Sequence, residues 1–513
     1  MSSPVTTTKK IHPFTVTSPD EDVQKERSNG SWYNGEYIKY SGLSWFFATL
    51  FTVGTLAGGA LVALPSAMVM SGIFPGILLT LIFGILFCYA SVCMGKSWCI
   101  LQKQWKEYEN FCRNPFSEMA FRAGGKRFRS FTVVIFYINQ FGTSIVFLLL
   151  ASKNLWSLLK VFYLVNIPFC YVILILGLLS LLCLFLKSPA DFWGIALCAM
   201  LSTAFVAALL IVGSEMDYAQ CEAHRELPKV SYTNVFLSVG IISYAYGGGA
   251  SLANVQHDMK RPSEFTFASI IGFIIIILFY IPVELVTYYT YGDSLRHSVL
   301  DSIQTLYIQN IVNLCIGIHC MMAFIINLNP LTLQIEEVIN IPNKFGIKRV
   351  LLRTTVLIAI IICALAVPTF GPIMHLLGGS TMMLTSLLIP IYMYTALKAR
   401  QKLIKKDSKY SNETPTFLQT LKNSSFKNNV IFGGIMIIGI ISMILITISS
   451  IKALLTTHYA PPCFISLFNK EPTSENYLAH TNCCGHYQNI SVHTYRTSFC
   501  STPQLDFYNN SIF

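Results

Sequence analysis

Apolar residues gather in long blocks along the chain, and short polar segments separate one block from the next. A helix needs about 20 predominantly apolar residues to cross the hydrocarbon core of a bilayer, so blocks of this length indicate membrane-spanning helices. Several blocks are apolar on all sides, as expected for helices that face both lipid and protein. The pattern predicts eleven spans, at residues 43–71, 73–98, 131–153, 165–187, 190–213, 231–257, 265–290, 304–329, 350–370, 372–397 and 429–452.

The composition agrees with a membrane protein. Hydrophobic residues make up 53% of the 513 residues and charged residues only 12%, whereas soluble domains average about 25% charged residues. The expected fold class is therefore an all-α polytopic membrane protein. Residues 1–40 differ from the rest, because they are polar and rich in Ser, Thr and charge. They predict a disordered N-terminal tail.

Lys and Arg residues in the short loops indicate the orientation. The formal net charge is +11, but the basic residues are spread over several loops and form no single patch, which argues against a nucleic-acid partner. Seven basic residues follow the second span and eight follow the tenth, whereas the alternate loops hold few. Since cytoplasmic loops carry the excess of Lys and Arg, the N-terminal tail and the loops after even-numbered spans are expected in the cytoplasm. An odd number of spans then places residues 453–513 outside the cell or in a lumen.

This C-terminal tail contains an even number of cysteines and two glycosylation sequons. The cysteines are Cys463, Cys483, Cys484 and Cys500, and the sequons begin at Asn489 and Asn509. Both features suit an oxidising, non-cytosolic compartment, and they predict a glycoprotein with at least one disulfide in the tail. Four cysteines allow three pairings, which stay open. The other cysteines lie mainly within spans, where they are expected to behave as small apolar residues.

Glycines interrupt two of the predicted spans. Span 1 contains Gly58 and Gly59 in its middle with Pro65 shortly after, and span 6 contains a run of three glycines at 247–249. If residues 43–213 and 231–397 are two repeats of five spans, with span 11 added after them, the interruptions hold matching positions. Matched interruptions of this kind point to the binding site of a secondary transporter. The simpler alternative is close helix packing, which small residues also allow.

Interrupted helices at membrane depth have free backbone N–H and C=O groups that can bind charged groups. Their free backbone groups persist only where they line a cavity or are buried in protein. Free N–H groups at the start of a half-helix favour a carboxylate, and free carbonyls at the end of a half-helix suit an ammonium group or a cation. A zwitterionic amino acid meets both requirements.

The interrupted segments resemble those of a known family. "GTLAGGALVALPSAM" in span 1 and "SYAYGGGASLANVQHDMKRPSEF" in span 6 are similar to the corresponding spans of the amino acid/auxin permease family, as are "YGDSLRHSVLDSIQ", "HCMMAFIINLNPLTLQIEE" and "GPIMHLLGGSTMMLTSLLIP". The resemblance covers roughly residues 40–455. It implies eleven spans, the inverted five-plus-five repeat of the LeuT-type fold, and secondary transport of amino acids by alternating access. Family members often have His at the position of Gly249 and Pro at that of Ala253.

The resemblance also implies which residues bind the substrate. The backbone of span 1 is expected to bind the carboxylate, and span 6 to bind the ammonium group and form the side-chain pocket. The residues concerned are Ala57, Gly58, Gly59, Ala60 and Leu61 in span 1, and Tyr246, Gly247, Gly248, Gly249 and Ser251 in span 6.

Polar residues inside the spans are candidates for coupling transport to an ion. A sodium ion needs oxygen ligands, which Thr55 and Asn327 can supply, whereas a proton relay needs a titratable group such as His319 or Glu284. Each of these residues has a simpler role as a buried polar group bonded to its own or a neighbouring helix. The choice between Na⁺ and H⁺ stays open. No cofactor other than a coupling ion, and no bound metal, is expected.

Other function classes agree less well with the sequence. A receptor is expected to have seven spans, and a channel a repeated filter or a charged ring. An intramembrane enzyme needs a cluster of catalytic groups, and His257 with Asp258 are too few for a metal site. A transporter-like amino acid sensor would share this sequence and stays as the alternative. The expected partners are a small amino acid and the lipid bilayer, and the plasma membrane is preferred over a lysosomal or vesicular membrane.

Overall fold

A computed structural model describes residues 30–110, 112–163, 167–183, 193–227, 230–341, 346–456, 463, 483–492 and 500–501. Within these residues, nine helices are long and apolar enough to cross a membrane. Two shorter apolar helices, α1 (Trp45–Leu56) and α6 (Phe169–Cys183), stand at the first and fourth predicted spans. The chain is therefore a multi-pass integral membrane protein, whereas the count of eleven spans stays a prediction.

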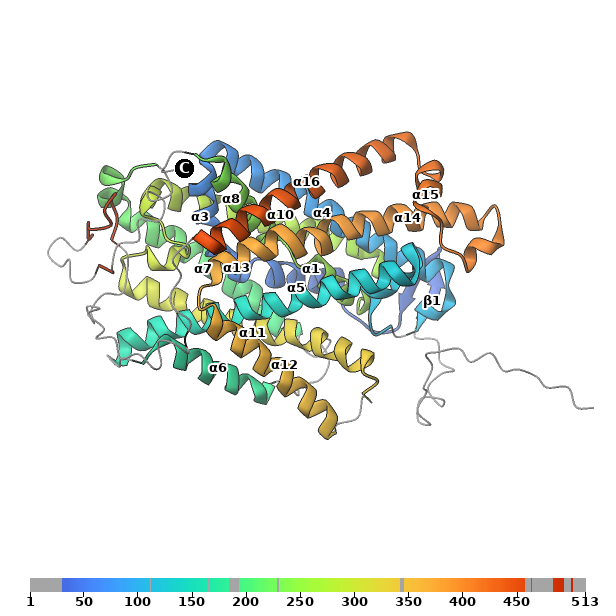
Figure 1. The fold of residues 1–513 in the computed structure, drawn as a ribbon, viewed down its shortest axis with the longest axis horizontal. Coiled ribbons are helices and arrows are strands. Elements are labelled where there is room, and N and C mark those ends of the chain that lie inside the picture. Colours follow the sequence, from blue (N-terminus) through green and yellow to red (C-terminus); the bar gives the residue numbers. More distant parts are fainter. Residues whose placement is uncertain are drawn as a thin grey trace, which may run out of the picture.

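The helices follow one another as elongated rods, most of them along the long axis of the molecule (Figure 1). After α1 they are α2 (Gly58–Leu61), α3 (Leu64–Ser71), α4 (Ile73–Gln104), α5 (Pro115–Tyr163), α6, α7 (Trp193–Cys221), α8 (Tyr232–Tyr246), α9 (Gly249–His257), α10 (Phe265–Tyr291), α11 (Leu306–Val338), α12 (Ile347–Ala366), α13 (Phe370–Leu377), the π-helix η7 (Gly378–Leu388), α14 (Ile389–Ile404), α15 (Phe417–Asn423) and α16 (Phe426–Thr456).

The interrupted spans lie in the interior of the bundle. Span 6, formed by α8 and α9, is mostly buried, and so is the long segment from α13 through η7 to α14. The last helix, α16, is mostly exposed and has an apolar surface, as expected for a helix that faces lipid. Because the glycine-interrupted segments are surrounded by other helices, their backbone groups are shielded from lipid, as an interruption at membrane depth requires.

The end of the predicted disordered tail is folded, which corrects that prediction. Strands β1 (Gly30–Tyr33) and β2 (Glu36–Lys39) pair in an antiparallel hairpin. The two turn residues, Asn34 and Gly35, both have positive φ, at 50° and 77°. Asn-Gly is the preferred pair for such a two-residue turn, because its backbone twist matches that of the strands. Polar composition hid this local signal.

The hairpin packs on the end of the bundle that carries the basic loops. Trp32 Nε1 donates to Glu109 Oε1 at 2.9 Å, and the hydroxyl of Tyr37 donates to the Glu109 carbonyl at 2.8 Å. The backbone N–H of Lys39 donates to the Lys260 carbonyl at 2.9 Å. A two-stranded hairpin is marginally stable alone, so these contacts with the helix ends account for its order.

Predicted span 3 is much shorter than the helix that contains it. The prediction was 131–153, whereas α5 covers Pro115–Tyr163 as two helical segments that meet at Gly125, a non-helical residue with φ 77° and ψ −170°. The basic residues assigned to a loop therefore lie partly on a helical extension. Ion pairs stabilise these charged turns, for example Arg129 with Glu118 at 3.1 Å. Hydropathy detects only the part of a helix that faces lipid, so it missed the charged part.

The tail cysteines pair mainly with the membrane helices. The disulfides are Cys170–Cys463, Cys221–Cys484 and Cys483–Cys500. Two of the four tail cysteines thus bond to α6 and α7, and only one disulfide lies within the tail. Counting pairings among the tail cysteines alone was wrong, as was treating every cysteine of the spans as an apolar residue. Cys463 and residues 483–492 of the tail thereby lie against the helix ends, at the opposite end of the long axis from β1 (Figure 1).

The two sequons differ in what the structure describes. Asn489 is exposed, beside the last residue of a tight turn that closes between Cys484 and Ile490. Asn509 lies outside the described residues. Glycosylation of either position stays a prediction.

Candidate functional site

The interruption of span 6 occupies two glycines between α8 and α9. After α8 ends at Tyr246, Gly247 is extended with φ −71° and ψ 158°. Gly248 follows with φ 116° and ψ −3°, a conformation that L side chains rarely adopt. Gly249 already begins α9. The three adjacent glycines therefore have different conformational requirements, and only Gly248 needs a positive φ.

The π-helix η7 lies against this interruption. The backbone N–H of Gly248 donates to Ser386 Oγ at 3.0 Å. A Cβ atom at Gly247 would lie well inside van der Waals contact with the side chain of Met382. Since π-helical turns change which side chains face a site, this segment of span 10 brings both residues to the break.

The interruption of span 1 is milder than expected. Gly58 and Gly59 belong to α2, which is a single helical turn. The chain leaves regular helix on either side of it, at Ala57 and at Val62, but both residues keep right-handed dihedrals. The N–H of Ala57 still donates to the Val53 carbonyl at 2.9 Å. Span 1 is thus a bent and partly opened helix rather than a fully unwound one.

Position 58 requires a glycine because another helix approaches the backbone closely there. An ideal Cβ at this position would overlap the imidazole ring of His319, with Nε2 as the nearest atom. His319, on α11, is itself buried. The interruption of span 1 therefore packs directly against α11, and any side chain at Gly58 must displace the ring or the backbone.

Tyr280, on α10, connects the two interruptions. Its hydroxyl lies 3.1 Å from the Leu56 carbonyl at the end of α1 and 3.0 Å from the Ala245 carbonyl near the end of α8. The hydroxyl hydrogen is shared between two carbonyls that a broken helix leaves without a full set of partners. The side chain is fully buried. Tyr280 therefore fixes the ends of the first half-helices of spans 1 and 6 relative to each other.

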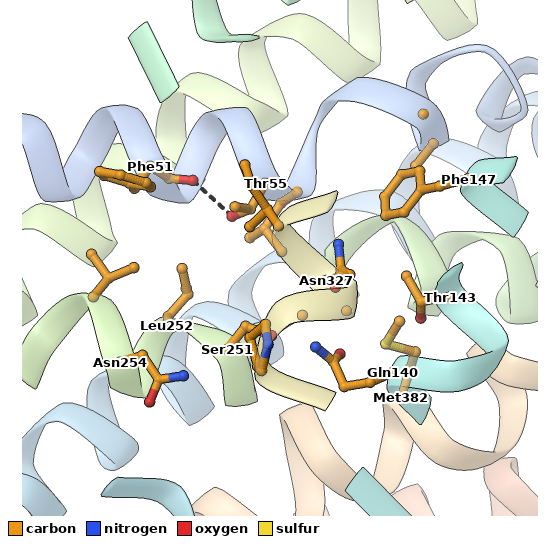
Figure 2. Close-up of a pocket in the computed structure, with 18 of the residues that line it drawn as sticks. Phe51, Thr55, Gln140, Thr143, Phe147, Ser251, Leu252, Asn254, Asn327 and Met382 are labelled. Carbon is orange, nitrogen blue, oxygen red and sulfur yellow. Dashed lines mark hydrogen bonds between the residues drawn. The ribbon is translucent and has the colours of Figure 1, made fainter. Parts of the chain in front are cut away.

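A cavity opens beside both interruptions (Figure 2). Its labelled side chains come from α1, α5, α9, α11 and η7. The cavity extends from the glycines of span 6 along α9 toward Asp258 and Leu43, at the end of the molecule that carries the hairpin. The lining residues are Leu43, Phe51, Thr55, Leu56, Gly59, Ala60, Gln140, Thr143, Phe147, Tyr244, Gly247, Gly248, Ser251, Leu252, Asn254, Val255, Asp258, Ile326, Asn327, Pro330 and Met382.

The structure brings some of the predicted residues together in this cavity and places others elsewhere. Those that line it are Thr55, Gly59, Ala60, Gly247, Gly248, Ser251 and Asn327. Those that do not are Ala57, Gly58, Leu61, Tyr246, Gly249 and His319. Tyr246 points to the opposite side of α8, where its ring stacks with Phe273 at a centroid distance of 6.1 Å.

Two candidate ion ligands already bond to their own helices. Thr55 Oγ1 donates to the Phe51 carbonyl at 2.7 Å (Figure 2). Asn327 Nδ2 donates to the Ala323 carbonyl at 2.8 Å. The NH₂ group of Asn327 is thus used within the helix, and its amide oxygen is the acceptor that it can offer to a ligand.

The sequence analysis did not predict that α5 lines the cavity. Gln140, Thr143 and Phe147 line the cavity from one face of this helix (Figure 2). The amide nitrogen of Gln140 is buried and has no hydrogen-bond partner among the described residues. The available signal was a set of polar side chains at i and i+3 in an apolar segment, which share one face of a helix. Met382 carried no such signal, because only the π-helical geometry brings it to the break.

The lining is almost entirely uncharged. Asp258 is its only ionisable acid or base apart from a tyrosine hydroxyl, and it lies at the hairpin end. Its carboxylate is 3.0 Å from Nδ1 of His257. Beside it, Lys39 donates to the His257 carbonyl. Burial lowers the pKa of the Lys39 ammonium, and the charge of Asp258 acts in the opposite direction.

Comparison with known proteins identifies the family. The model of the family described as "Transmembrane amino acid transporter protein" matches residues 41–444. The chain belongs to this family, the amino acid/auxin permeases. The resemblance found in the sequence is thereby confirmed, and the permease is not an enzyme.

Relatives of this permease occur in Arabidopsis thaliana. Amino acid transporter AVT1B is 25% identical over 358 residues, which cover 67% of this chain and 63% of that protein. Lysine histidine transporter-like 6 is 24% identical over 380 residues, which cover 69% of this chain and 83% of that protein. The permease spans less than two thirds of the length of AVT1B and also of AVT1D, of which it covers 62%.

Solved structures share its fold. The crystal structure of MhsT in complex with L-phenylalanine aligns with a TM-score of 0.53 at 11% identity, covering 80% of this chain and 99% of that chain. A manganese transporter of Eremococcus coleocola aligns with a TM-score of 0.51 at 13% identity, covering 85% of this chain and 90% of that chain. The permease therefore has the LeuT-type transporter fold.

Proposed function

We propose that the permease is a secondary active transporter of neutral amino acids, with the substrate bound in the cavity between spans 1 and 6. The observation that carries this proposal is the cavity itself, which lies beside both interrupted spans and has an almost uncharged lining. Membership of an amino acid transporter family supports it. The proposal includes eleven spans in an inverted five-plus-five repeat, with the hairpin in the cytoplasm and the disulfide-bonded tail outside.

Each end of a zwitterionic substrate has a candidate partner. The carboxylate is assigned to the backbone of α2 near Gly59 and Ala60, where N–H groups at the start of a helical segment favour negative charge. The ammonium group is assigned to the backbone carbonyl at Gly247 and to the amide oxygen of Asn327. The side chain then extends toward Gln140 and Phe147.

Because the cavity contains almost no charge, it favours a substrate with a neutral side chain. An unpaired buried charge costs several kcal/mol, so a cationic or acidic substrate needs an opposite charge nearby. Asp258 lies ten residues beyond Gly248 along α9, which corresponds to about 15 Å at the rise of an α-helix. That distance is too long for a lysine side chain whose α-carbon sits at the interruption. Lysine, which the name of lysine histidine transporter-like 6 mentions, is therefore not expected to be a substrate of this chain.

We assign the structure to the inward-facing state of an alternating-access cycle, because the cavity extends toward the hairpin end, which is proposed to be cytoplasmic. Its lining includes Asp258 and Leu43 at the hairpin end and includes none of the disulfide-bonded residues. Movement of the bundle that contains spans 1 and 6 against the other helices would open the opposite side. The coupling ion is Na⁺, with oxygens from Thr55 and Asn327, or H⁺, carried by His319 or Glu284. The plasma membrane remains the preferred location.

Uptake into proteoliposomes tests the proposal. The purified chain is reconstituted and supplied with labelled L-Ala, L-Gln, L-Phe, L-Lys and L-Glu, with and without a sodium gradient and at two pH values. We expect saturable, stereoselective uptake of neutral substrates that follows one ion gradient. Uptake of lysine alone would refute the neutral class. Binding of an amino acid without uptake, in correctly inserted protein, would favour the transporter-like sensor instead.

Gln140 is expected to act on substrate affinity. Replacing Gln140 by Leu removes the amide that faces the cavity, and one lost hydrogen bond of about 0.5–1.5 kcal/mol corresponds to a rise in KM of roughly 2- to 13-fold. Thr355→Val, on the exposed face of α12, is the control and should leave KM unchanged. Equal KM values for Gln140→Leu and the unaltered permease would remove α5 from the substrate site.

Tyr280 is expected to be needed for transport more than for folding. Tyr280→Phe keeps the ring but leaves two buried carbonyls without the shared donor, at a cost of about 1–3 kcal/mol. We expect a lower maximal uptake rate together with normal membrane insertion. Tyr289→Phe, an exposed position on the same helix, is the control. An unchanged rate in Tyr280→Phe would show that the hydroxyl does not hold the two half-helices.

A further inference from the structure

A cluster of potential metal ligands lies at the disulfide-bonded end of the permease, away from the substrate cavity. It combines Glu226, Asp293 and His486, one donor atom from each, and these atoms all lie within 4.8 Å of one another. They come from three separate segments: the stretch after α7, the stretch after α10, and the C-terminal tail. We propose that these three side chains form a binding site for a divalent transition metal ion, with Zn²⁺ as the best match.

The distances suit tetrahedral coordination. His486 Nδ1 lies 3.2 Å from Asp293 Oδ2 and 3.4 Å from Glu226 Oε2. With Zn²⁺–N and Zn²⁺–O bonds of about 2.0–2.2 Å, two ligand atoms of a tetrahedral site lie roughly 3.3–3.5 Å apart. One imidazole and two carboxylates leave a fourth position for water. The two negative charges balance the charge of the ion.

The choice of donor atoms separates zinc from the abundant hard cations. Mg²⁺ and Ca²⁺ prefer all-oxygen sites with six or more ligands. An imidazole nitrogen with two carboxylates favours the borderline first-row metals, of which zinc accepts this mixed set in a four-coordinate site. Zinc is therefore the probe with which to test the cluster.

Two of the ligands are held in position by backbone pairing. The N–H of Asp293 donates to the Glu226 carbonyl at 3.0 Å, and the N–H of Glu226 donates to Asp293 Oδ1 at 3.2 Å. Gly292 permits this contact, because a Cβ there would lie 2.7 Å from the Glu226 carbonyl oxygen. Asp293 is fully buried and presents its second oxygen to His486. Such hydrogen bonds orient a metal ligand before the ion binds.

The third ligand is held by the disulfides of the tail. His486 stands in a tight turn closed by two backbone hydrogen bonds of 3.0 Å between Cys484 and Ile490. Cys484 is bonded to Cys221 at the end of α7, only five residues before Glu226. The turn is thereby attached to the segment that carries another ligand. The Asp293 carboxylate and the His486 turn are thus held by contacts that do not depend on the ion, whereas Glu226 is fixed through its backbone and its exposed carboxylate reaches the cluster beside His486.

Zinc titration of the intact, disulfide-bonded chain tests the site. Purified full-length permease in detergent is freed of metal with a chelator and titrated with ZnCl₂ by calorimetry, with millimolar Mg²⁺ present. We expect one zinc ion per chain, and at least a tenfold weaker affinity in His486→Ala and in Asp293→Asn. Asparagine keeps an acceptor for the Glu226 N–H group, so the backbone pairing is retained. Zinc should also raise the melting temperature of the unaltered permease but not of these two variants.

Matched controls separate this site from general effects. Tyr487→Ala alters the same turn without removing a donor, and Glu222→Gln removes an exposed carboxylate near Glu226 that is outside the cluster. Both should bind zinc as the unaltered chain does. An X-ray absorption spectrum should show nitrogen and oxygen ligands only. Absence of stoichiometric binding, unchanged affinity in both ligand variants, or sulfur in the first coordination shell would each overturn the proposal.

Discussion

Gly58→Ala should strongly reduce amino acid uptake while the protein still inserts into the membrane. The added methyl group would overlap the imidazole of His319, and that ring is buried between helices with little room to move. Overpacking of a dense interior usually costs about 1–3 kcal/mol. Here the strain falls on α2, where the substrate carboxylate is assigned, so we expect at least a tenfold loss of uptake. Proteoliposome uptake is the measurement, with size-exclusion chromatography as the check on folding.

A second substitution distinguishes this steric cause from others. In the double variant Gly58→Ala, His319→Ala the imidazole is gone, so the melting temperature, lowered by Gly58→Ala, should return toward that of the His319→Ala single variant. Gly434→Ala, on α16, is the matched control, because a Cβ there meets nothing within 4 Å. Full uptake by Gly58→Ala alone would contradict the close packing of span 1 against α11.

Gly248→Ala is expected to cause the second large loss of uptake. At φ 116° a residue with a Cβ is strained by about 1–3 kcal/mol. The same Cβ would lie 2.8 Å from Leu56 Cδ2, at the end of α1. Relief of this strain requires the break in span 6 to change shape, which displaces the backbone assigned to the ammonium group. We expect uptake to fall at least tenfold in the same assay.

The neighbouring glycine provides the control for Gly248. Gly249 has no positive φ, and a Cβ there would meet Ser386 at 3.5 Å, an ordinary van der Waals contact. Gly249→Ala should therefore keep most of its uptake. Similar losses in both variants would mean that the assigned break is wrong by at least one residue.

The lining of the cavity beside the interruptions is almost uncharged. The space beside Gly249 is bounded by Ser386 and not by a charged group. Among the residues that line the cavity, only Asp258 and the hydroxyl of Tyr244 can titrate. Selectivity is then expected to depend on the amide and hydroxyl groups of α5 and α11.

The sequence by itself determined the membrane class, the approximate positions of most apolar helices and the interruption of span 6. These features follow from local rules: the length of apolar blocks and the conformational freedom of glycine. The motifs of spans 1 and 6 also sufficed to identify the family. Even the hairpin at Asn34 and Gly35 had a local signal, although polar composition concealed it.

Only the tertiary structure decided which residues face the cavity and which bonds join distant segments. The roles of Gln140, Tyr280 and Met382 depend on the packing of α5, α10 and η7 around the interruptions, and sequence spacing does not encode contacts between helices. The disulfides join residues up to 293 positions apart. Apolar periodicity specifies that a helix enters the membrane, but helices in lipid associate through side-chain shape and a few polar contacts. Those determinants exist only once the helices are packed together.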